Sequence, residues 1–369
     1  MGFKQAPAMP YSGQPVSAVI NRWLRFDPQN KRGLIIKAGT IIRKQNGTLR
    51  IFAEDTSIDL TSQLGTAGAD YFVYLNNDDS FSALSSKTGT GAYIGRFHTL
   101  CADAGSSLSM IMMCQGTTSV DLMVKGYRAD EDPDFYALYH RTGTGTGGTA
   151  YNRITVTHPM QGFVAGDILP ESVCCLTFGP GCLYDDAVVY DKDTDRFIDV
   201  YLQSGYAQNT RSVYNATHTV SREQINHLED MRMVGKRLLT DWEFTSAAIG
   251  SNEKTNITGS SDKGTVGGHV DTSNRRMISA IGCEEMCGYI WQWLDEIAPV
   301  GGSGWNTYDR DNIFGQNYGT IPYALLAGGN WYDGAACGSR SRNSDNPRSY
   351  VNAHFGGRGS SRVKRGWGD

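Results

Sequence analysis

The last forty residues constrain the fold of this chain more than any other segment. Glycines stand at close intervals from Gly328-Gly329 to Gly356-Gly357, and chemically scattered side chains fill the spaces between them. No helical or strand periodicity runs through the segment, which argues against one long amphipathic helix. A glycine-rich skeleton that carries scattered polar and aromatic side chains is more typical of a binding surface than of a core.

Two sets of residues can be separated in and around this segment. The candidate ligand-contacting side chains are Asn330, Tyr332, Asp333, Ala336, Ser344, Asp345, Arg348, Tyr350, Asn352 and His354. The candidate frame residues are Trp242, Trp291, Trp293, Trp331, Gly338, Arg340 and Arg358. A rigid frame reduces the entropy that exposed side chains lose on binding, and Tyr332 and Tyr350 are the expected aromatic anchors. An ordinary solvated loop face is the alternative interpretation.

Length and composition narrow the class of protein. The chain has 369 residues, which favours two or three domains. The formal net charge of −4 gives no general argument for binding nucleic acid or an anionic membrane. The 44 glycines and 11% aromatic residues indicate turn-rich β architecture. No apolar run reaches the roughly 18–20 residues of a membrane span, and the N-terminus lacks the apolar stretch of a secretory signal. We therefore expect synthesis in a cytoplasm and no membrane insertion.

The pattern along the chain predicts four regions. Residues 1–32 are irregular, and 33–105 form an all-β, sandwich-like module with a tight hairpin at Asn46-Gly47. Residues 106–154 connect, with a Gly/Thr-rich linker at 141–148. Residues 155–369 form the ligand-binding domain, with a variable region at about 330–357. This domain is expected to hold a helix over 221–231, a strand over 286–293 and a second helix that Thr240 and Glu243 begin as a capping box, with Trp242 facing inward.

Three motifs, in order, resemble a known family. The run from Gly235-Lys236-Arg237 to Phe244 resembles the helix signature of the formylglycine-generating-enzyme-like C-type lectin folds. Gly288–Trp293 resembles the aromatic strand of that family, and the glycine frame at 328–359 resembles its closing strands. The resemblance implies an α+β protein, with a C-type lectin-like domain at the C-terminal end and an all-β module before it.

The closing frame resembles more specifically the variable proteins of diversity-generating retroelements. In that family, randomised adenines in a template copy create the variable positions, mostly within Asn codons that cannot become Lys, Glu, Gln, Met or Trp. From Asn330 to Arg362 the chain contains no Lys, Glu, Gln or Met, and its only Trp is the frame residue Trp331. The resemblance therefore implies a hypervariable surface for ligand binding. Small polar binding loops are also poor in Met and Glu.

An enzyme is the main rival. The enzyme branch of the resembled fold uses a reactive cysteine or a metal-bound cysteine pair near its C-terminal region. Cys337 lies at a comparable place, but no second cysteine follows it. No Ser, His and Asp set appears at a recognisable spacing either. We expect no enzymatic activity and a small, buried Cys337. Most of the eight cysteines are expected to be packed thiols, although a pairing of Cys174 or Cys175 with Cys182 stays open.

Two further ligands, a metal ion and nucleic acid, have weaker support in the sequence. Asp191, Asp193 and Asp195 have the spacing of a calcium loop but lack its following Gly and later Glu, which favours a solvated hairpin turn. Asp345-Asn346-Pro347 has the letters of a calcium-dependent sugar site in a different order. We expect no required cofactor, and a structural calcium ion stays an alternative. The basic end, Arg362, Lys364 and Arg365, is a weak argument for nucleic acid.

The resemblance also implies partners and a location. It implies a receptor-binding tail-fibre protein of a virus or phage, made in the host cytoplasm and carried on the virion. Its ligand would be a host surface protein or glycan. The N-terminal module would attach it to the fibre or mediate assembly as a homo-oligomer, with a trimer as the expected form. A diversified receptor displayed on a cell surface is the alternative.

Overall fold

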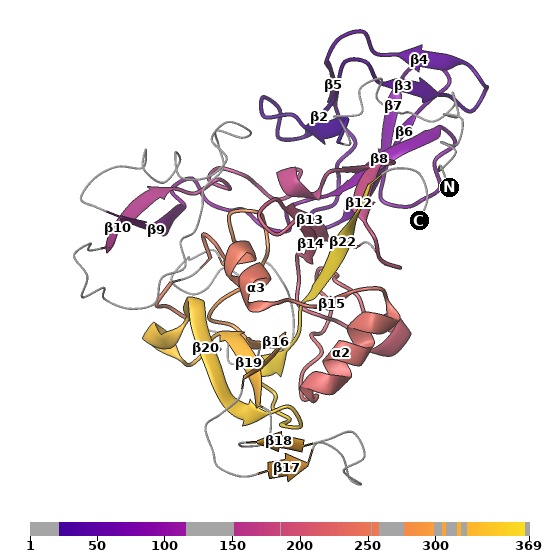
Figure 1. Ribbon diagram of the computed structural model, residues 1–369. Coiled ribbons are helices and arrows are strands. Elements are labelled where there is room, and N and C mark those ends of the chain that lie inside the picture. The colour runs from indigo at the N-terminus through magenta and orange to yellow at the C-terminus, as the bar shows by residue number, and fades with distance from the viewer. Residues whose placement is uncertain are drawn as a thin grey trace, which may run out of the picture.

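The computed structural model describes residues 22–115, 151–184, 186–251, 253–257, 277–298, 305–307, 316–318 and 323–365. The predicted Gly/Thr-rich linker lies outside these ranges. The described chain is mostly β, with two α-helices. The N-terminal strands lie at one end of the molecule and the strands around the closing glycine frame at the other (Figure 1). No helix in the described ranges has the length and apolar character needed to cross a bilayer.

Short strands build the N-terminal end. β1 (Leu24–Phe26), β2 (Gly33–Ile36) and β5 (Thr56–Asp59) form one antiparallel sheet, so the expectation of an irregular segment is wrong at 24–26. β3 (Ile41–Arg43) and β4 (Leu49–Ile51) form a separate hairpin. Gly47, at a φ of +85°, supplies the left-handed conformation that the tight turn between them needs, as the sequence predicts.

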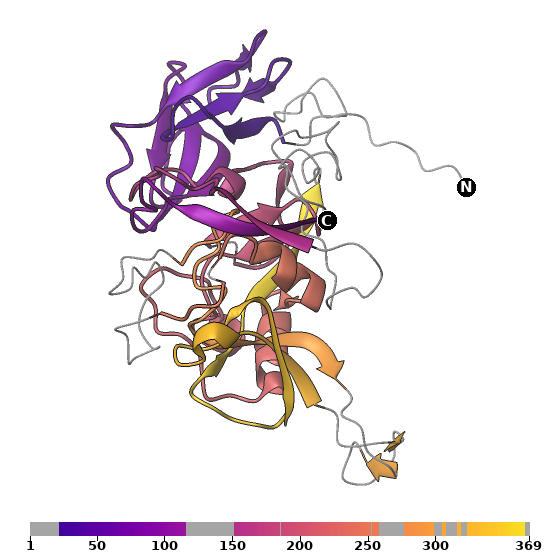
Figure 2. The ribbon, with the colours of Figure 1, turned by 90° about the vertical axis from the view of Figure 1, so that its left-hand side faces the viewer.

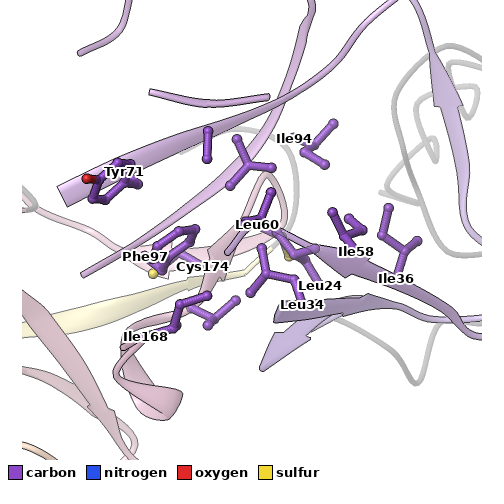
Figure 3. Packing of buried hydrophobic residues seen from close by; sticks show 14 of the residues in the cluster. Leu24, Leu34, Ile36, Ile58, Leu60, Tyr71, Ile94, Phe97, Ile168 and Cys174 are labelled. Carbon is purple, nitrogen blue, oxygen red and sulfur yellow. The ribbon is translucent and has the colours of Figure 1, made fainter. Parts of the chain in front are cut away.

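One apolar core joins these strands to later parts of the chain. β6 (Asp70–Leu75), β7 (Phe81–Leu84) and β8 (Ala92–His98) lie against the first sheet, and side chains such as Leu34 and Phe97 are fully buried between them. Figure 3 shows Ile168 and Cys174, from beyond residue 105, in the same cluster. The N-terminal strands and the later chain therefore share a core.

The largest sheet makes this connection through hydrogen bonds. Its nine strands include β6, β7 and β8 together with strands from the later chain, in the order β13-β14-β22-β12-β11-β8-β6-β7, with β15 pairing with β22. The later strands are β11 (Cys174–Cys175), β12 (Phe178–Pro180), β13 (Val188–Asp191), β14 (Arg196–Asp199), β15 (Arg237–Leu238) and β22 (Gly359–Arg365). β22 lies between β14 and β12, so the end of the glycine frame is fixed inside this sheet.

The hairpin of β13 and β14 forms as predicted, but its turn is not fully solvated. Asp191 is 2% exposed. Its carboxylate accepts hydrogen bonds from the backbone N–H of Asp193 at 3.1 Å and from the hydroxyls of Thr194 and Ser246 at 2.8 and 3.0 Å. Ser246 belongs to a helix that is distant in sequence, and this packing is what removes Asp191 from water.

Two helices follow the hairpin. α2 spans Gln224–Met233 and α3 spans Asp241–Ala247. Thr240 and Glu243 form the predicted capping box at the start of α3. The prediction that Trp242 faces inward is wrong, since the side chain is 47% exposed. Phe244 is fully buried, and residues two apart on a helix point in nearly opposite directions, so both cannot face the core.

A second sheet carries the closing segment. Its order is β20-β19-β16-β21, from β16 (Trp291–Ala298), β19 (Tyr323–Gly328), β20 (Gly338–Pro347) and β21 (Phe355–Gly356). The predicted aromatic strand thus starts at Trp291 rather than 286, after Gly288 takes a φ of +74°. Two strand pairs stand apart from these sheets: β9 (Ser109–Gln115) with β10 (Tyr151–Thr157), and β17 (Trp305–Thr307) with β18 (Gln316–Tyr318).

Candidate ligand-binding surface

Two loops of the second sheet carry eight of the ten candidate side chains, and Ser344 and Asp345 lie on β20 between the loops. Residues 329–337 join β19 to β20, and residues 348–354 lead from β20 back to β21, which pairs in parallel with β16. Figure 2 shows this part of the chain, in yellow, at the end of the molecule away from the N-terminal strands. The sheet therefore presents both loops at one end of the fold.

The glycines at the start of the first loop are required by close packing. Gly328 and Gly329 have φ values of +98° and +85°, a region that other residues rarely adopt. A Cβ on Gly328 would lie 2.5 Å from the carbonyl oxygen of Met286, and one on Gly329 would lie 2.9 Å from the Cα of Cys337. Backbone therefore approaches both positions too closely for any side chain.

An aromatic cluster forms where the two loops meet. The rings of Trp331 and His354 lie 4.2 Å apart, and that of Tyr332 lies 5.5 Å from Trp331 and 5.0 Å from His354. The Tyr332 hydroxyl is 2.7 Å from Nδ1 of His354. Asn352 accepts the backbone N–H of His354 at 2.8 Å, and Trp291 donates its backbone N–H to the His354 carbonyl at 2.9 Å. Tyr332 is 60% exposed and Trp331 and His354 are half-buried, so the cluster reaches solvent mainly through Tyr332.

Asn330 does not belong to the exposed set. Its side chain is 2% exposed, and Oδ1 accepts the backbone N–H of Tyr332 at 3.0 Å. Its own backbone N–H donates to the half-buried Asp333 at 2.8 Å. The expectation of a ligand-contacting Asn330 side chain is therefore wrong in this conformation, because the side chain shapes the loop that presents Tyr332.

A second group of candidate residues lies at the other end of β20. Ser344 and Asp345 are exposed near its last residues, while Ala336 is exposed in the first loop. The antiparallel register places Pro347 opposite Tyr323 and Gly338 opposite Gly328. With a rise of about 3.3 Å per residue, these two ends of the strand pair are roughly 17 Å apart. The candidate positions therefore spread along an elongated surface and do not converge on one point.

Arg348 and Tyr350 are held from below. Nε of Arg348 donates to Oε1 of the fully buried Gln224 at 2.6 Å, and the Gln224 backbone N–H donates to the Arg348 carbonyl at 2.9 Å. Tyr350 is 42% exposed and lies 5.7 Å, ring to ring, from the buried Phe355. Phe355 packs in turn against Trp293 at 5.1 Å. Arg348 and Tyr350 therefore both contact buried residues.

Frame residues hold the loops through buried polar contacts. Arg358 is 1% exposed and donates to Gln292 at 3.0 Å and to three backbone carbonyls, those of Asp199, Val200 and Glu284, at 2.8, 2.6 and 2.5 Å. These bonds link the residue just before β22 to β14 of the largest sheet and to β16 of the second sheet. Trp293 and Trp291 are 0% and 8% exposed, whereas Trp331, Arg340 and Arg342 are half-buried. Gly338 is buried at the start of β20.

Two supporting residues could not be picked out from the sequence. Glu253 accepts the backbone N–H and the hydroxyl of Ser339, and burial raises the pKa of its carboxyl. Arg342 donates to Asp241 and, at 2.6 Å, to the hydroxyl of Thr245 on α3. Both contacts are long-range, and neither residue belongs to a local motif that would signal them.

Cys337 lacks the exposure and the lowered thiol pKa of a reactive cysteine. Cys337 is 2% exposed, its thiol donates to the Asn330 carbonyl at 3.3 Å, and burial raises its pKa to about 12. A nucleophilic cysteine needs a lowered thiol pKa and access to substrate. None of the seven cysteines whose side chains the structure describes forms a disulfide, so Cys182 is not paired with Cys174 or Cys175. Within the same described ranges, no three His, Cys, Asp or Glu side chains are grouped to hold a metal ion.

Comparison with solved structures identifies proteins of similar architecture. Structures named Major Tropism Determinant I1, M1 and U1 variants match 96% of this chain, with TM-scores of 0.68, 0.67 and 0.66. The matches cover 87%, 86% and 87% of those chains, each at 22% sequence identity. The chain has the Major Tropism Determinant fold. A sequence identity of 22% supports a shared fold and no further shared property. No protein-family model and no curated protein matches the chain.

Proposed function

We propose that this protein is a diversified ligand-binding protein that recognises a host surface molecule for a phage or virus. One observation carries the proposal: exposed, chemically varied side chains stand on loops whose backbone is fixed by buried residues. Tyr332 and Tyr350 are exposed, while Arg358, Gln224 and Asn330 are buried and hydrogen-bonded. The exposed residues of such a surface can change in identity while the backbone of the loops keeps its conformation.

The fold supports this proposal. The solved structures that the chain resembles are named as variants of a tropism determinant. A C-type lectin-like domain, proposed here for residues 155–369, would present the elongated surface described above. The absence of Lys, Glu, Gln and Met from 330 to 362 agrees with diversification through Asn codons. The ligand would be a surface protein or glycan, and the protein would act on the virion. A displayed cellular receptor remains the alternative location.

A binding role fits the site better than catalysis. The buried Cys337, with a pKa raised to about 12, does not suit the formylglycine-generating type of chemistry. We propose that the surface works without a cofactor. Addition of EDTA should leave the thermal unfolding midpoint of the purified protein unchanged, and a clear drop in that midpoint would instead indicate a structural calcium ion.

Homo-oligomeric assembly, with a trimer as the proposed form, would use the N-terminal end. Leu49 and Ile51 on β4 are 50% and 62% exposed, which is unusual for two large apolar residues on one face of a strand. Sedimentation of the full chain and of a Leu49→Ser/Ile51→Ser variant tests this. The variant is expected to have a lower mass, and a monomeric unmodified chain would contradict the proposal.

Randomisation provides the central test. One library would vary Tyr332, Asp345 and Tyr350, and a matched library would vary Gly329, Cys337 and Arg358. Binding of a conformation-specific antibody raised against the N-terminal end reports folding. Most members of the first library are expected to fold and most of the second to fail, because only the second changes buried positions. Equal failure of both libraries would overturn the proposal.

The genomic neighbourhood gives an independent check. A nearby reverse transcriptase gene, with a near-copy of codons 330–362 that differs only at adenines, is the expected finding. A near-copy whose differences fall on all four bases would exclude this mode of diversification while leaving a fixed binding surface intact.

A further inference from the structure

A groove lies at the opposite end of α2 from the candidate ligand-binding surface. The end of α2, the segment 180–183 and the closing strand β22 line it, and its volume is about 720 Å³. The first residue of α2, Gln224, contacts Arg348 of the candidate surface. The last residue, Met233, lines the groove. A helix of this length spans about 15 Å, so the two sites are separate.

One wall of the groove is apolar and open to water. Leu183 and Met233 both line the groove and are 63% and 55% exposed. Large apolar side chains gathered at a groove are a common mark of an interaction site, whereas single exposed ones are ordinary. The grouping therefore points to a partner with an apolar side chain of its own.

The other wall is positively charged. Arg362 and Lys364 on β22 line the groove, and neither forms an ion pair or side-chain hydrogen bond with the residues that the structure describes. Neighbouring cations differ in this respect. Arg365 pairs with Asp195 at the edge of the same strand, and the buried Lys236 pairs with Asp199 at 2.6 Å. On β22, the described strand that lines the groove, Arg362 and Lys364 thus differ from Arg365, which has a carboxylate partner.

The spacing of these cations selects the shape of the partner. Alternate residues of a strand lie about 7 Å apart on the same side. Two acidic residues separated by one position in an extended peptide have the same spacing. A single phosphate or carboxylate between the two cations would leave Leu183 and Met233 uncovered. We propose that this groove binds an extended segment of another protein that has Asp or Glu at alternate positions and an apolar side chain beside them.

Selection from a library of short random peptides, displayed on an unrelated carrier, tests the proposal on the full chain. The enriched peptides are expected to carry two acidic residues separated by one position, next to Leu, Ile, Met or Phe. Fluorescence anisotropy of a labelled enriched peptide then compares variants. Arg362→Glu/Lys364→Glu is expected to weaken binding on the order of tenfold, because two attractive pairs become repulsive. Leu183→Ser/Met233→Ser is expected to weaken it as well.

Matched controls separate the groove from general charge and from the candidate surface. Arg25→Glu/Lys87→Glu makes the same change in net charge at exposed N-terminal positions, and Tyr332→Ala/Tyr350→Ala alters the candidate surface. Both are expected to bind the peptide as the unmodified chain does. If the charge reversal at the groove lowers the thermal unfolding midpoint, Arg362→Gln/Lys364→Gln replaces it.

Three binding results would overturn the proposal. They are enrichment of peptides without acidic residues, equal binding by the groove variant, and loss of binding on the Tyr332→Ala/Tyr350→Ala change. Sedimentation covers one more occupant: a lower oligomeric mass for Arg362→Glu/Lys364→Glu would assign the groove to a second copy of this chain and would also overturn it.

Discussion

The hydroxyl of Tyr332 lies 2.7 Å from Nδ1 of His354, twenty-two positions further along the chain. The contact joins the two loops of the candidate surface above the half-buried Trp331. Both side chains belong to the set proposed to vary, so the contact is a property of this particular combination of residues and not of the frame. A neutral imidazole that accepts the hydroxyl at Nδ1 carries its proton on Nε2.

Replacement of Tyr332 by Phe should remove the hydrogen bond to Nδ1 of His354 without unfolding the protein. The change removes the hydroxyl but keeps the ring at a site that is 60% exposed, so stability should change by no more than about 0.5 kcal/mol. Nitrogen NMR of the imidazole should show the Nε2–H form in the unmodified chain and a mixture of the two neutral forms in the variant. An unchanged imidazole spectrum would show that the contact does not exist in solution.

Replacement of the buried Arg358, in contrast, should strongly destabilise the protein. Its buried guanidinium bonds three backbone carbonyls and Gln292, so Arg358→Met would remove one hydrogen bond from each of these four buried acceptors. We expect a loss of about 3–5 kcal/mol in the free energy of unfolding, measured with urea. The exposed Arg362→Met is the control on the neighbouring strand β22 and should cost no more than about 0.5 kcal/mol. Similar costs for the two variants would contradict the frame role of Arg358.

The tryptophans offer a matched pair. Trp293→Ala removes a fully buried side chain and should destabilise the fold by about 3–5 kcal/mol. Trp242→Ala removes one that is 47% exposed, and the cost should stay below about 1.5 kcal/mol. Thermal unfolding of both variants distinguishes them. A larger loss for Trp242→Ala would restore the inward-facing position that the sequence suggests.

Alkylation measures the state of Cys337 directly. Burial raises its pKa to about 12, so at pH 8 the thiol is protonated as well as inaccessible. Iodoacetamide treatment of the native protein, followed by mass spectrometry of the peptides, should leave Cys337 unmodified. The half-buried Cys182 should react faster and serves as the internal comparison. Rapid modification of Cys337 would support the enzymatic alternative.

Local signals were sufficient for part of this fold. The Asn46-Gly47 hairpin and the Thr240 capping box depend on residues within a few positions of each other, and both are present as predicted. The fold class, mostly β with two helices and the Major Tropism Determinant architecture, agrees with the motifs at 235–244 and 328–359. The residues within such motifs determine their local conformation, so the motifs can be recognised in the sequence.

Long-range contacts explain what the sequence could not show. Asn330 looks like any exposed polar residue until the loop folds over it, and Gln224 supports Arg348 from 124 positions away. Trp242 is a large aromatic residue of the kind often found in a core, but on the short helix α3 it is Phe244 whose side chain points into the core. The ligand-binding roles of the remaining candidate residues stay predictions, because exposure shows that a side chain is available and not what it binds.

Asp191 illustrates the same limit and yields the last prediction. The turn 191–195 looks solvated in sequence, yet burial raises the pKa of Asp191 from 3.8 to about 6. The folded protein therefore takes up a proton at Asp191 more readily than the unfolded chain does. Its contribution to stability is fully present below about pH 4 and is lost as the pH rises through 6. Relative to Asp191→Asn, the unmodified chain should gain up to about 3 kcal/mol between pH 7 and pH 4. Urea unfolding of both proteins across this range measures the difference, and a difference that stays constant with pH would show that Asp191 is solvated after all.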